Sequence, residues 1–108
     1  MSTTYTFKYS KPDAVFNSAE EAIADKNSLF GLELQNQVLT TFSAAQDTGI
    51  LISYASNWDQ ATHTLTLTRE ISDVDAFLSA IRQDGTGARA IAQSELAGWT
   101  YLNNDRTS

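Results

Sequence analysis

The chain of 108 residues contains no cysteine, a single proline and a single histidine. Without cysteine there is no disulfide framework, no thiol nucleophile and no thiolate metal site, and the composition is compatible with a reducing compartment. His63 supplies one imidazole, so a zinc site would need carboxylates for its remaining ligands. We therefore predict neither a metal site nor a bound cofactor.

Apolar runs long enough to cross a membrane are also missing, since a span needs about 20 consecutive apolar residues. Residues 1–11, MSTTYTFKYSK, lack the basic-then-apolar layout of a secretory signal. These two absences predict a soluble, cytoplasmic protein.

Basic residues are scarce, because 7 Lys and Arg stand against 13 Asp and Glu, which gives a net charge of −6. Binding to nucleic acid or to an anionic membrane needs clustered positive charge, and these basic residues are scattered. Both partners are therefore disfavoured. The acidic residues are dispersed as well, which favours a role in solubility. An acidic inhibitor of a basic, nucleic-acid-binding protein stays open as an alternative.

The length and the 42% hydrophobic content suit one domain over residues 1–108, with a single core. Its first regular element is predicted at residues 3–9, TTYTFKY, where polar and aromatic side chains alternate. This pattern is typical of a half-buried strand, with Tyr5, Phe7 and Tyr9 on one face.

Two helices are predicted before the middle of the chain. Ser18 and Glu21 form a capping box that begins a short helix reaching about Lys26. Residues 30–46 place apolar side chains at i, i+4, i+8 and i+11, which favours a helix, although the central run VLTTF also allows a strand. Gly49 tolerates positive φ and is expected to end this helix.

A hairpin follows, with strands at residues 50–56 (ILISYAS) and 62–71 (THTLTLTREI) and a polar turn at 57–61. Two alternating runs separated by a short polar turn predict an antiparallel pair. Leucines of the second strand share one face with His63 and Arg69, and threonines line the other face.

Ser72 and Asp75 form a second capping box, and apolar residues then recur at i, i+3, i+4 and i+7 from Val74. This is the strongest helical pattern of the sequence. A break precedes an alanine-rich helix at 88–98, and residues 103–108 are expected to be frayed.

The order strand, helix, strand, strand, helix, helix predicts an α+β fold. We expect an antiparallel sheet of three or four strands with the helices on one face, in the ferredoxin-like β-α-β-β-α plan plus a C-terminal helix. A fourth strand is not evident, because helix 88–98 takes its place. The side chains expected to face the helices are Tyr5, Phe7, Tyr9, Ile52, Tyr54, Leu65 and Leu67.

Two short motifs are interpreted as breaks between elements. Asp47-Thr48-Gly49 matches the tripeptide of aspartic proteases, but it follows a predicted helix and lacks that family's context, so we interpret it as a helix stop. Residues 85–90 have the form G-x-G-x-x-A, but they follow a helix instead of the strand that a dinucleotide site requires, which favours a linker.

Four hairpin residues are the candidates for ligand binding: His63, Arg69, Tyr54 and Trp58. His63 is the one side chain that ordinarily titrates near neutrality, but a structural role is favoured. Arg69 is expected to reach solvent or to pair with an acid such as Asp73, and the alternative is a clamp on a ligand carboxylate. Trp58 either exposes an aromatic surface in the turn or packs on a helix. No catalytic residue is assigned.

Residues 48–82 carry a glycine before an apolar strand, a polar turn, a returning strand that ends in Glu70, and a capped helix with Ala76 and Phe77. This segment resembles the hairpin-then-helix half of small dimeric α+β barrel domains, of which the antibiotic-biosynthesis monooxygenase-like group is the best known. It is also similar to small orphan proteins of tailed phages. The resemblance implies a pocket between sheet and helices, lined by Tyr5, Phe7, Tyr54, His63 and Arg69.

The function that we expect from the sequence is that of a non-enzymatic interaction module, which forms a homodimer and is open to a further protein partner. The similarity to phage proteins implies that the protein is phage-encoded. Association would use the threonine face or the hairpin edge. The alternative is a small-ligand-binding protein or a cofactor-free, monooxygenase-like enzyme.

Overall fold

The computed structural model describes residues 3–83 and 86–107. It contains a four-stranded sheet, and one pair of helices follows the first strand while a second pair follows the third strand. The elements in chain order are β1 (Thr3–Ser10), α1 (Ala19–Lys26), α2 (Leu32–Asp47), β2 (Leu51–Asp59), β3 (Thr64–Ile71), α3 (Val74–Gln83), α4 (Thr86–Leu96) and β4 (Thr100–Thr107).

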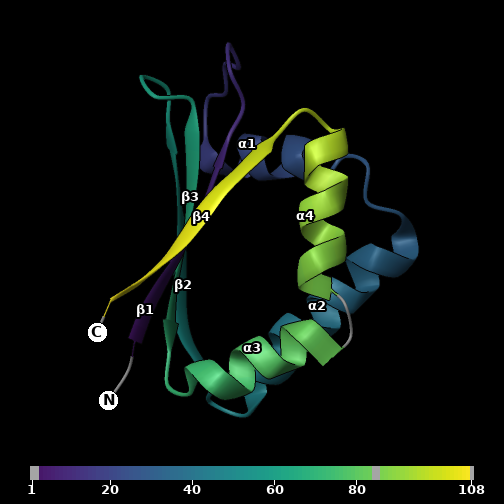
Figure 1. The fold of residues 1–108 in the computed structure, drawn as a ribbon, viewed down its shortest axis with the longest axis vertical. Coiled ribbons are helices and arrows are strands. Elements are labelled where there is room, and N and C mark those ends of the chain that lie inside the picture. The colour runs from purple at the N-terminus through teal and green to yellow at the C-terminus, as the bar shows by residue number, and fades with distance from the viewer. Residues whose placement is uncertain (1–2, 84–85, 108) are drawn as a thin grey trace.

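The strands lie in the order β2-β3-β1-β4, and every neighbouring pair is antiparallel. Figure 1 shows the sheet on one side of the molecule and the four helices on the other. The predicted α+β fold, with an antiparallel sheet and helices on one face, is thereby confirmed. The β-α-β-β-α-β order is that of the ferredoxin-like plan, with each helical crossover made of two helices.

The predicted fraying of residues 103–108 is wrong as far as Thr107, because these residues belong to the fourth strand. β4 pairs with β1 from Ser10 opposite Thr100 to Thr4 opposite Thr107. The alanine-rich helix does not take the place of this strand. It ends at Leu96, and the chain then turns at Gly98, whose φ is 95°.

The core lies between the sheet and the helices in two clusters of buried side chains. Phe7 packs against both of them, so β1, one of the two central strands, joins the two clusters. One cluster contains Tyr5, Ala45, Leu51, Ile71, Val74 and Phe77, and the other contains Tyr9, Ala22, Leu65 and Trp99.

A β-bulge at the start of β2 overturns the predicted orientation of Ile52. Leu51 pairs with Ile71 and the next pair is Ser53 with Glu70, so Ile52 is the extra residue. A bulge leaves its extra residue unpaired and shifts the alternation of side chains. Leu51 is therefore buried, at 3% exposure, whereas Ile52 is 52% exposed. The hairpin turn also lies later than predicted, at residues 60–63.

The two helices of the first crossover begin and end largely as predicted. The Ser18 hydroxyl accepts a hydrogen bond from the Glu21 amide at 3.2 Å, and the Glu21 carboxylate accepts one from the amide of Asn17 at 2.9 Å. Residues 32–47 form a helix and not a strand. Gly49 follows its end with a φ of 76°, so the Asp-Thr-Gly tripeptide stops a helix here.

The cap of α3 is Asp73 and not Ser72. The Asp73 carboxylate accepts a hydrogen bond from the Ala76 amide at 3.0 Å, which satisfies a free amide of the first helical turn. The Ser72 hydroxyl instead donates to the carbonyl oxygen of Gly49 at 2.8 Å. The capping box predicted for Ser72 and Asp75 is therefore wrong, and a single side-chain cap by Asp73 stands in its place. The linker predicted at residues 85–90 is wrong from Thr86 on, because α4 begins there, and residue 85 lies outside the described part.

No described helix covers the second face of the sheet (Figure 1). The pairing of β1 with β3 places polar side chains of both strands on this surface, which we call the open face. Its members on these two central strands are Thr4, Thr6, Lys8, Ser10, Thr64, Thr66, Thr68 and Glu70, all of them half-buried.

Candidate functional site

The four candidate residues of the hairpin separate into two pairs. Tyr54 lies opposite Arg69 near one end of the β2–β3 pair. Trp58 lies near the other end, beside the turn that contains His63, and their ring centroids are 6.4 Å apart. Since Tyr54 and Trp58 are four residues apart on a strand, roughly 13 Å separates the two pairs. The four residues therefore do not form one site.

His63 lies in the hairpin turn with a φ of 52°, and not at the start of a strand. Its Nδ1 is 3.0 Å from the carbonyl oxygen of Ala14. Because a carbonyl oxygen only accepts hydrogen bonds, this contact is a hydrogen bond in the tautomer that carries its proton on Nδ1, and Gln60 Nε2 lies 3.4 Å from the same nitrogen. The main-chain oxygen of His63 also accepts a hydrogen bond from the amide of Lys11 at 3.1 Å. His63 therefore ties the segment after β1 to the hairpin.

Trp58 packs among other aromatic side chains and is half-buried. It lies on β2, its ring centroid is 4.9 Å from that of Phe16 and 5.8 Å from that of Trp99, and both contacts are edge-on. Its Nε1 donates to Gln60 at 2.8 Å, and Gln60 donates in turn to Ala14 at 2.6 Å. Trp58 therefore belongs to the same structural connection as His63.

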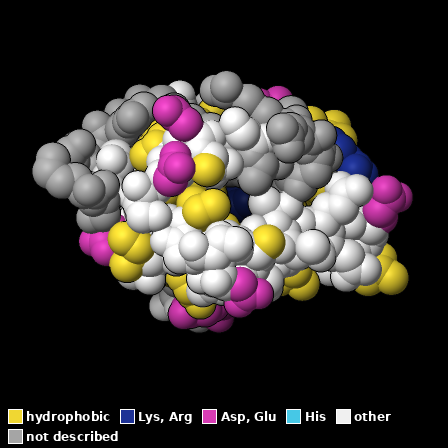
Figure 2. All heavy atoms as spheres, turned by 90° about the horizontal axis from the view of Figure 1, so that it is seen from below, with side chains coloured by type: hydrophobic (Ala, Val, Ile, Leu, Met, Phe, Trp, Pro, Cys, Tyr) yellow, Lys and Arg dark blue, Asp and Glu magenta, His cyan; other side chains and the backbone are white. Residues whose placement is uncertain are grey.

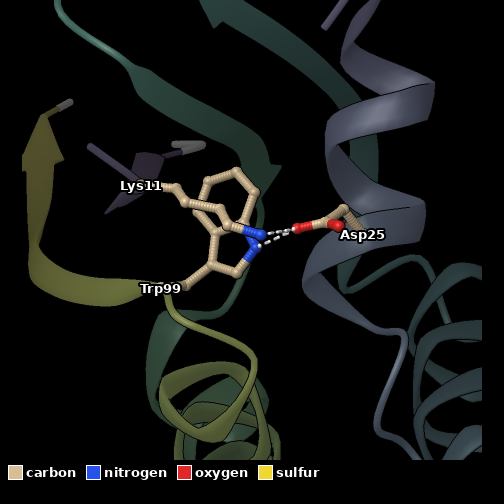
Figure 3. A network of polar contacts seen from close by, with 3 residues as sticks. All are labelled: Lys11, Asp25 and Trp99. Carbon is tan, nitrogen blue, oxygen red and sulfur yellow. Dashed lines mark hydrogen bonds and ion pairs between the residues drawn. The ribbon is translucent and has the colours of Figure 1, made fainter. Parts of the chain in front are cut away.

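Asp25 of α1 is in contact with Lys11, which follows β1, and with Trp99, which precedes β4 (Figure 3). One of its carboxylate oxygens accepts hydrogen bonds from Lys11 Nζ at 2.6 Å and from Trp99 Nε1 at 3.0 Å. Burial raises the pKa of Asp25, but the hydrogen bonds from Lys11 and Trp99 and the charge of Lys11 outweigh it, so the pKa is lowered overall. Asp25 therefore connects α1 to the end of β1 and to the start of β4.

Arg69 projects from β3 toward α2. The centre of its guanidinium group is 5.4 Å from the ring centroid of Phe42 and 5.7 Å from that of Tyr54. Its Nη1 donates to the carbonyl oxygens of Thr68 at 3.0 Å and Ala55 at 3.4 Å. The predicted pairing with Asp73 is wrong, because that carboxylate caps α3.

Lys26, which the sequence reasoning did not single out, is a second cation on the helix side of the sheet, and its side chain is only 5% exposed. Its ammonium group is 4.8 Å from the ring centroid of Tyr9 and 5.5 Å from that of Phe30, and it donates to Asn27 Oδ1 at 2.9 Å. Burial, and to a smaller extent the charge of Arg69, lower the pKa of Lys26 to about 8.

Tyr9 completes the polar groups around Lys26. Burial and, to a smaller extent, the neighbouring Tyr101 raise the pKa of Tyr9 and the charge of Arg69 lowers it in part, so that the pKa is raised overall to about 12. The rings of Tyr9 and Tyr101 are 5.1 Å apart. The Tyr9 hydroxyl therefore stays protonated at neutral pH and remains available as a hydrogen-bond donor.

An open hollow with a volume of about 360 Å³ lies next to this region, between α1 and α2. Asn27 and Phe30, two of the three residues that contact the ammonium group of Lys26, are among its lining residues. Small-molecule pockets range from roughly 300 to 1,000 Å³, so the hollow is large enough for a small ligand.

Within residues 3–83 and 86–107, no three His, Asp or Glu side chains gather in a group that could hold a metal ion. The helices in the same part of the chain are all too short or too polar to cross a membrane.

No protein-family model matches this chain, and neither does any curated protein. Solved structures do match. A candidate antibiotic biosynthesis monooxygenase from Deinococcus radiodurans has a TM-score of 0.55 at 13% identity, over 100% of this chain and 91% of that one.

A dimeric ferredoxin-like protein from an uncultured marine organism has a TM-score of 0.53 at 10% identity, over 98% and 92% of the two chains. A conserved protein from Methanosarcina mazei Go1 has a TM-score of 0.51 at 14% identity, over 99% and 89%. These similarities confirm the resemblance to ferredoxin-like proteins, including one of the monooxygenase-like kind. At such identities they show the fold alone.

Proposed function

We propose that this protein is a non-enzymatic interaction module that forms a homodimer through the open face of its sheet. The observation that carries the proposal is that all four helices cover one face and leave the other bare (Figure 1). An antiparallel sheet of this kind has either water or a second layer on its free face. A second copy of the chain is the layer that we propose.

The composition of the open face supports a partner of the same kind. Its two central strands contribute five threonines, and their charged residues are one lysine and one glutamate. A two-fold interface uses the same patch twice, so a patch without an excess of one charge can pack on itself. The structural neighbour from the uncultured marine organism is a dimeric ferredoxin-like protein, which is consistent with this arrangement.

The mass in solution tests this proposal. Light scattering over a range of concentrations should give the mass of two chains. Thr66→Lys places a charge in the centre of the open face and should yield a folded monomer. Thr40→Lys, on the exposed surface of α2, is the matched control and should stay dimeric. A wild-type chain that remains monomeric at high concentration contradicts the proposal.

A second candidate is a small-ligand-binding protein with its site between the sheet and the helices. Arg69 and Tyr54 favour it, because they lie face to face on the helix side and the guanidinium group has no carboxylate partner in the described part of the chain. Monooxygenase-like activity is a proposal that draws on the Deinococcus neighbour. A thermal-shift screen with small organic molecules tests for binding, and Tyr54→Ala should weaken any response.

Two further expectations stay predictions. An acidic inhibitor of a basic partner should bind less well as the salt concentration rises, because exposed charges are screened. A phage origin rests on the similarity of residues 48–82 to orphan phage proteins.

A further inference from the structure

The outer edge of β2 has no strand partner in the described part of the chain. The order β2-β3-β1-β4 puts β2 at one edge of the sheet and β4 at the other. All residues of β2 from 52 to 57 are exposed. They include Tyr54 and Ser56, which lie on the helix side of the sheet, where a strand covered by helices would bury its side chains. The helices therefore leave this part of β2 largely uncovered.

The β2 edge is also the less protected of the two sheet edges. Proteins usually protect an edge strand from pairing with another chain by lysine, proline, a bulge or a short length. β2 is nine residues long, contains no lysine, arginine or proline, and has its bulge at Ile52, near its start. β4, in contrast, contains Asp105 and Arg106, and its register with β1 shifts within the strand. An added strand is therefore expected at β2.

Tyr54 provides a fixed aromatic surface at this edge. Its side chain is 58% exposed, and its ring centroid is 5.0 Å from that of Phe42 on α2 and 5.7 Å from the centre of the Arg69 guanidinium group. Exposed aromatic side chains are enriched at binding surfaces, and a side chain that is already held in place loses little freedom on binding. A neighbouring residue of an added strand can therefore pack on this ring.

The charges beside the edge on the open face are acidic. Asp59 belongs to β2, and Glu70 lies opposite Ser53 on β3. Lys8 also lies on the open face, but it belongs to β1, two strand spacings or roughly 10 Å from β2. Figure 2 shows acidic side chains at several places on the face seen from below, while basic atoms are visible in a central recess and at one side. These charges favour a basic partner strand.

The same charges disfavour a second copy of β2 as the partner. An antiparallel pair of two β2 strands centred on Ser56 would place Asp59 of one chain opposite Ser53 of the other, beside Glu70 of that chain. Like charges at neighbouring cross-strand positions are destabilising. A lysine or arginine at the same positions would be attracted to both acids.

We propose that the edge of β2 binds an extended segment of a partner protein as an added antiparallel strand. The segment has basic residues at positions on the open face, beside Asp59 and Glu70, and apolar residues on the helix side, beside Tyr54. Main-chain hydrogen bonds supply affinity in this mode of recognition, and alternate side chains supply specificity. The edge is separate from the open face, so this inference goes beyond the homodimer and does not depend on it.

The test uses a labelled heptapeptide, Lys-Ala-Thr-Val-Thr-Val-Lys, with blocked termini, and fluorescence anisotropy. Alanine stands beside Trp58, because the Phe16 ring centroid is 4.9 Å from that of Trp58 and leaves less room. The protein should bind this peptide saturably. Replacing both lysines by glutamate should weaken binding by about fivefold or more, and this difference should shrink as the salt concentration rises.

Methylation of the peptide nitrogens distinguishes strand addition from any other contact. Amides at successive residues of a strand point to opposite sides, so either the even or the odd set faces β2. Methylation of one set should weaken binding by about tenfold or more, because several hydrogen bonds are lost, and methylation of the other set should have little effect. Hydrogen exchange followed by NMR should then show added protection at alternate residues of 53–59 and none in β4.

Substitutions in the protein test the two side-chain contacts. Asp59→Asn removes the charge but keeps an oxygen for the amide of Ala61, and it should weaken binding of the lysine peptide by about two- to threefold. Glu95→Gln is the matched control on the exposed surface of α4 and should leave affinity unchanged. Tyr54→Ser should weaken binding by about fivefold, whatever the charge of the peptide. Circular dichroism of each variant shows whether it is folded.

Four outcomes overturn the inference. Absence of saturable binding of the lysine peptide at millimolar concentration removes it. Equal weakening by the two methylated peptides would mean that the peptide does not add as a strand. Protection in β4 instead of β2 would place the partner at the other edge. Protection of residues 53–59 that rises with protein concentration in the absence of peptide would assign the edge to a second copy of the chain.

Discussion

The ammonium group of Lys26 lies 4.8 Å from the ring centroid of Tyr9, on the helix side of the sheet. The pKa of Lys26 is lowered to about 8 and that of Tyr9 is raised to about 12, mainly because both are buried. Lysine therefore loses its proton well before tyrosine in this protein, whereas the two groups titrate close together when exposed. Both shifts favour the neutral form of the side chain in the folded state.

The free energy of unfolding should rise with pH between about 8 and 10. In that window the unfolded chain still protonates Lys26 and the folded chain does not, so the unfolded state binds more protons and stability increases with pH. One pKa unit corresponds to about 1.4 kcal/mol, so the gain should be of the order of 2–3 kcal/mol. Urea denaturation at pH 7.5, 9 and 10 measures it.

Lys26→Met is the control for this pH dependence. It removes the titrating group, so the rise between pH 8 and 10 should disappear, and the variant should be at least as stable as the wild type at pH 7.5 because a buried charge is lost. Above pH 10 the trend should reverse in both proteins, since the unfolded chain then loses the Tyr9 proton that the folded chain retains. A flat profile in the wild type contradicts the burial of a charged Lys26.

Asp25→Asn should lower the free energy of unfolding by about 1 kcal/mol at pH 7, because two hydrogen bonds to a carboxylate become bonds to a neutral amide on a partly exposed side chain. The lowered pKa of Asp25 means that its contribution is present above the unfolded pKa and is lost as the pH falls through the folded one. The difference from the wild type should therefore shrink below pH 4. Asp47→Asn, at the exposed end of α2, should be neutral.

His63→Ala should destabilise the protein by about 1 kcal/mol, because alanine is strained at a φ of 52° and cannot donate to the oxygen of Ala14. His63→Asn should cost less, since asparagine is enriched in the left-handed region and keeps a donor. Thermal melting ranks the two variants. Equal destabilisation by the two substitutions would contradict the role of the left-handed backbone conformation at residue 63.

Gly49→Ala should lower the free energy of unfolding by about 1–2 kcal/mol, because its φ of 76° disfavours any side chain. Gly31→Ala is the comparison, since neither glycine has an atom within 4 Å of an added Cβ and Gly31 has an extended φ of −67°. The smaller cost at Gly31 isolates the backbone contribution at Gly49. Equal losses of stability in the two variants would contradict a requirement for a positive φ at residue 49.

Local patterns in the sequence were sufficient to predict three of the four strands and the four helices that the structure describes. Alternation located β1 and β3, and period-3.6 stripes located α2 and α3, because these elements bury one face each. β4 lacks such a pattern in its NNDRT segment. It exists because β1 supplies hydrogen bonds along its length, which is a tertiary effect that no local window contains.

The candidate site was predicted only in part, for reasons that can be traced to particular residues. Arg69 and Tyr54 were placed on the correct face by strand alternation, and their contact follows from the hairpin register. Ile52 was predicted on the helix side of the sheet because the alternation of side chains along the strand gives no sign of the bulge. Lys26 was missed although it lies one helical turn after the buried Ala22, a spacing that places a lysine on the inner face of α1.

The position of β1 between β3 and β4 has a consequence for how the molecule folds. Tyr5 pairs with Arg69 on one side and Arg106 on the other, so both pairings close long loops. Non-local pairing slows folding, and the β2–β3 hairpin is the one strand pair that can form locally. We expect this hairpin to appear early, and we expect the edge of β1 that pairs with β4 to stay unpaired until β4 has been synthesised.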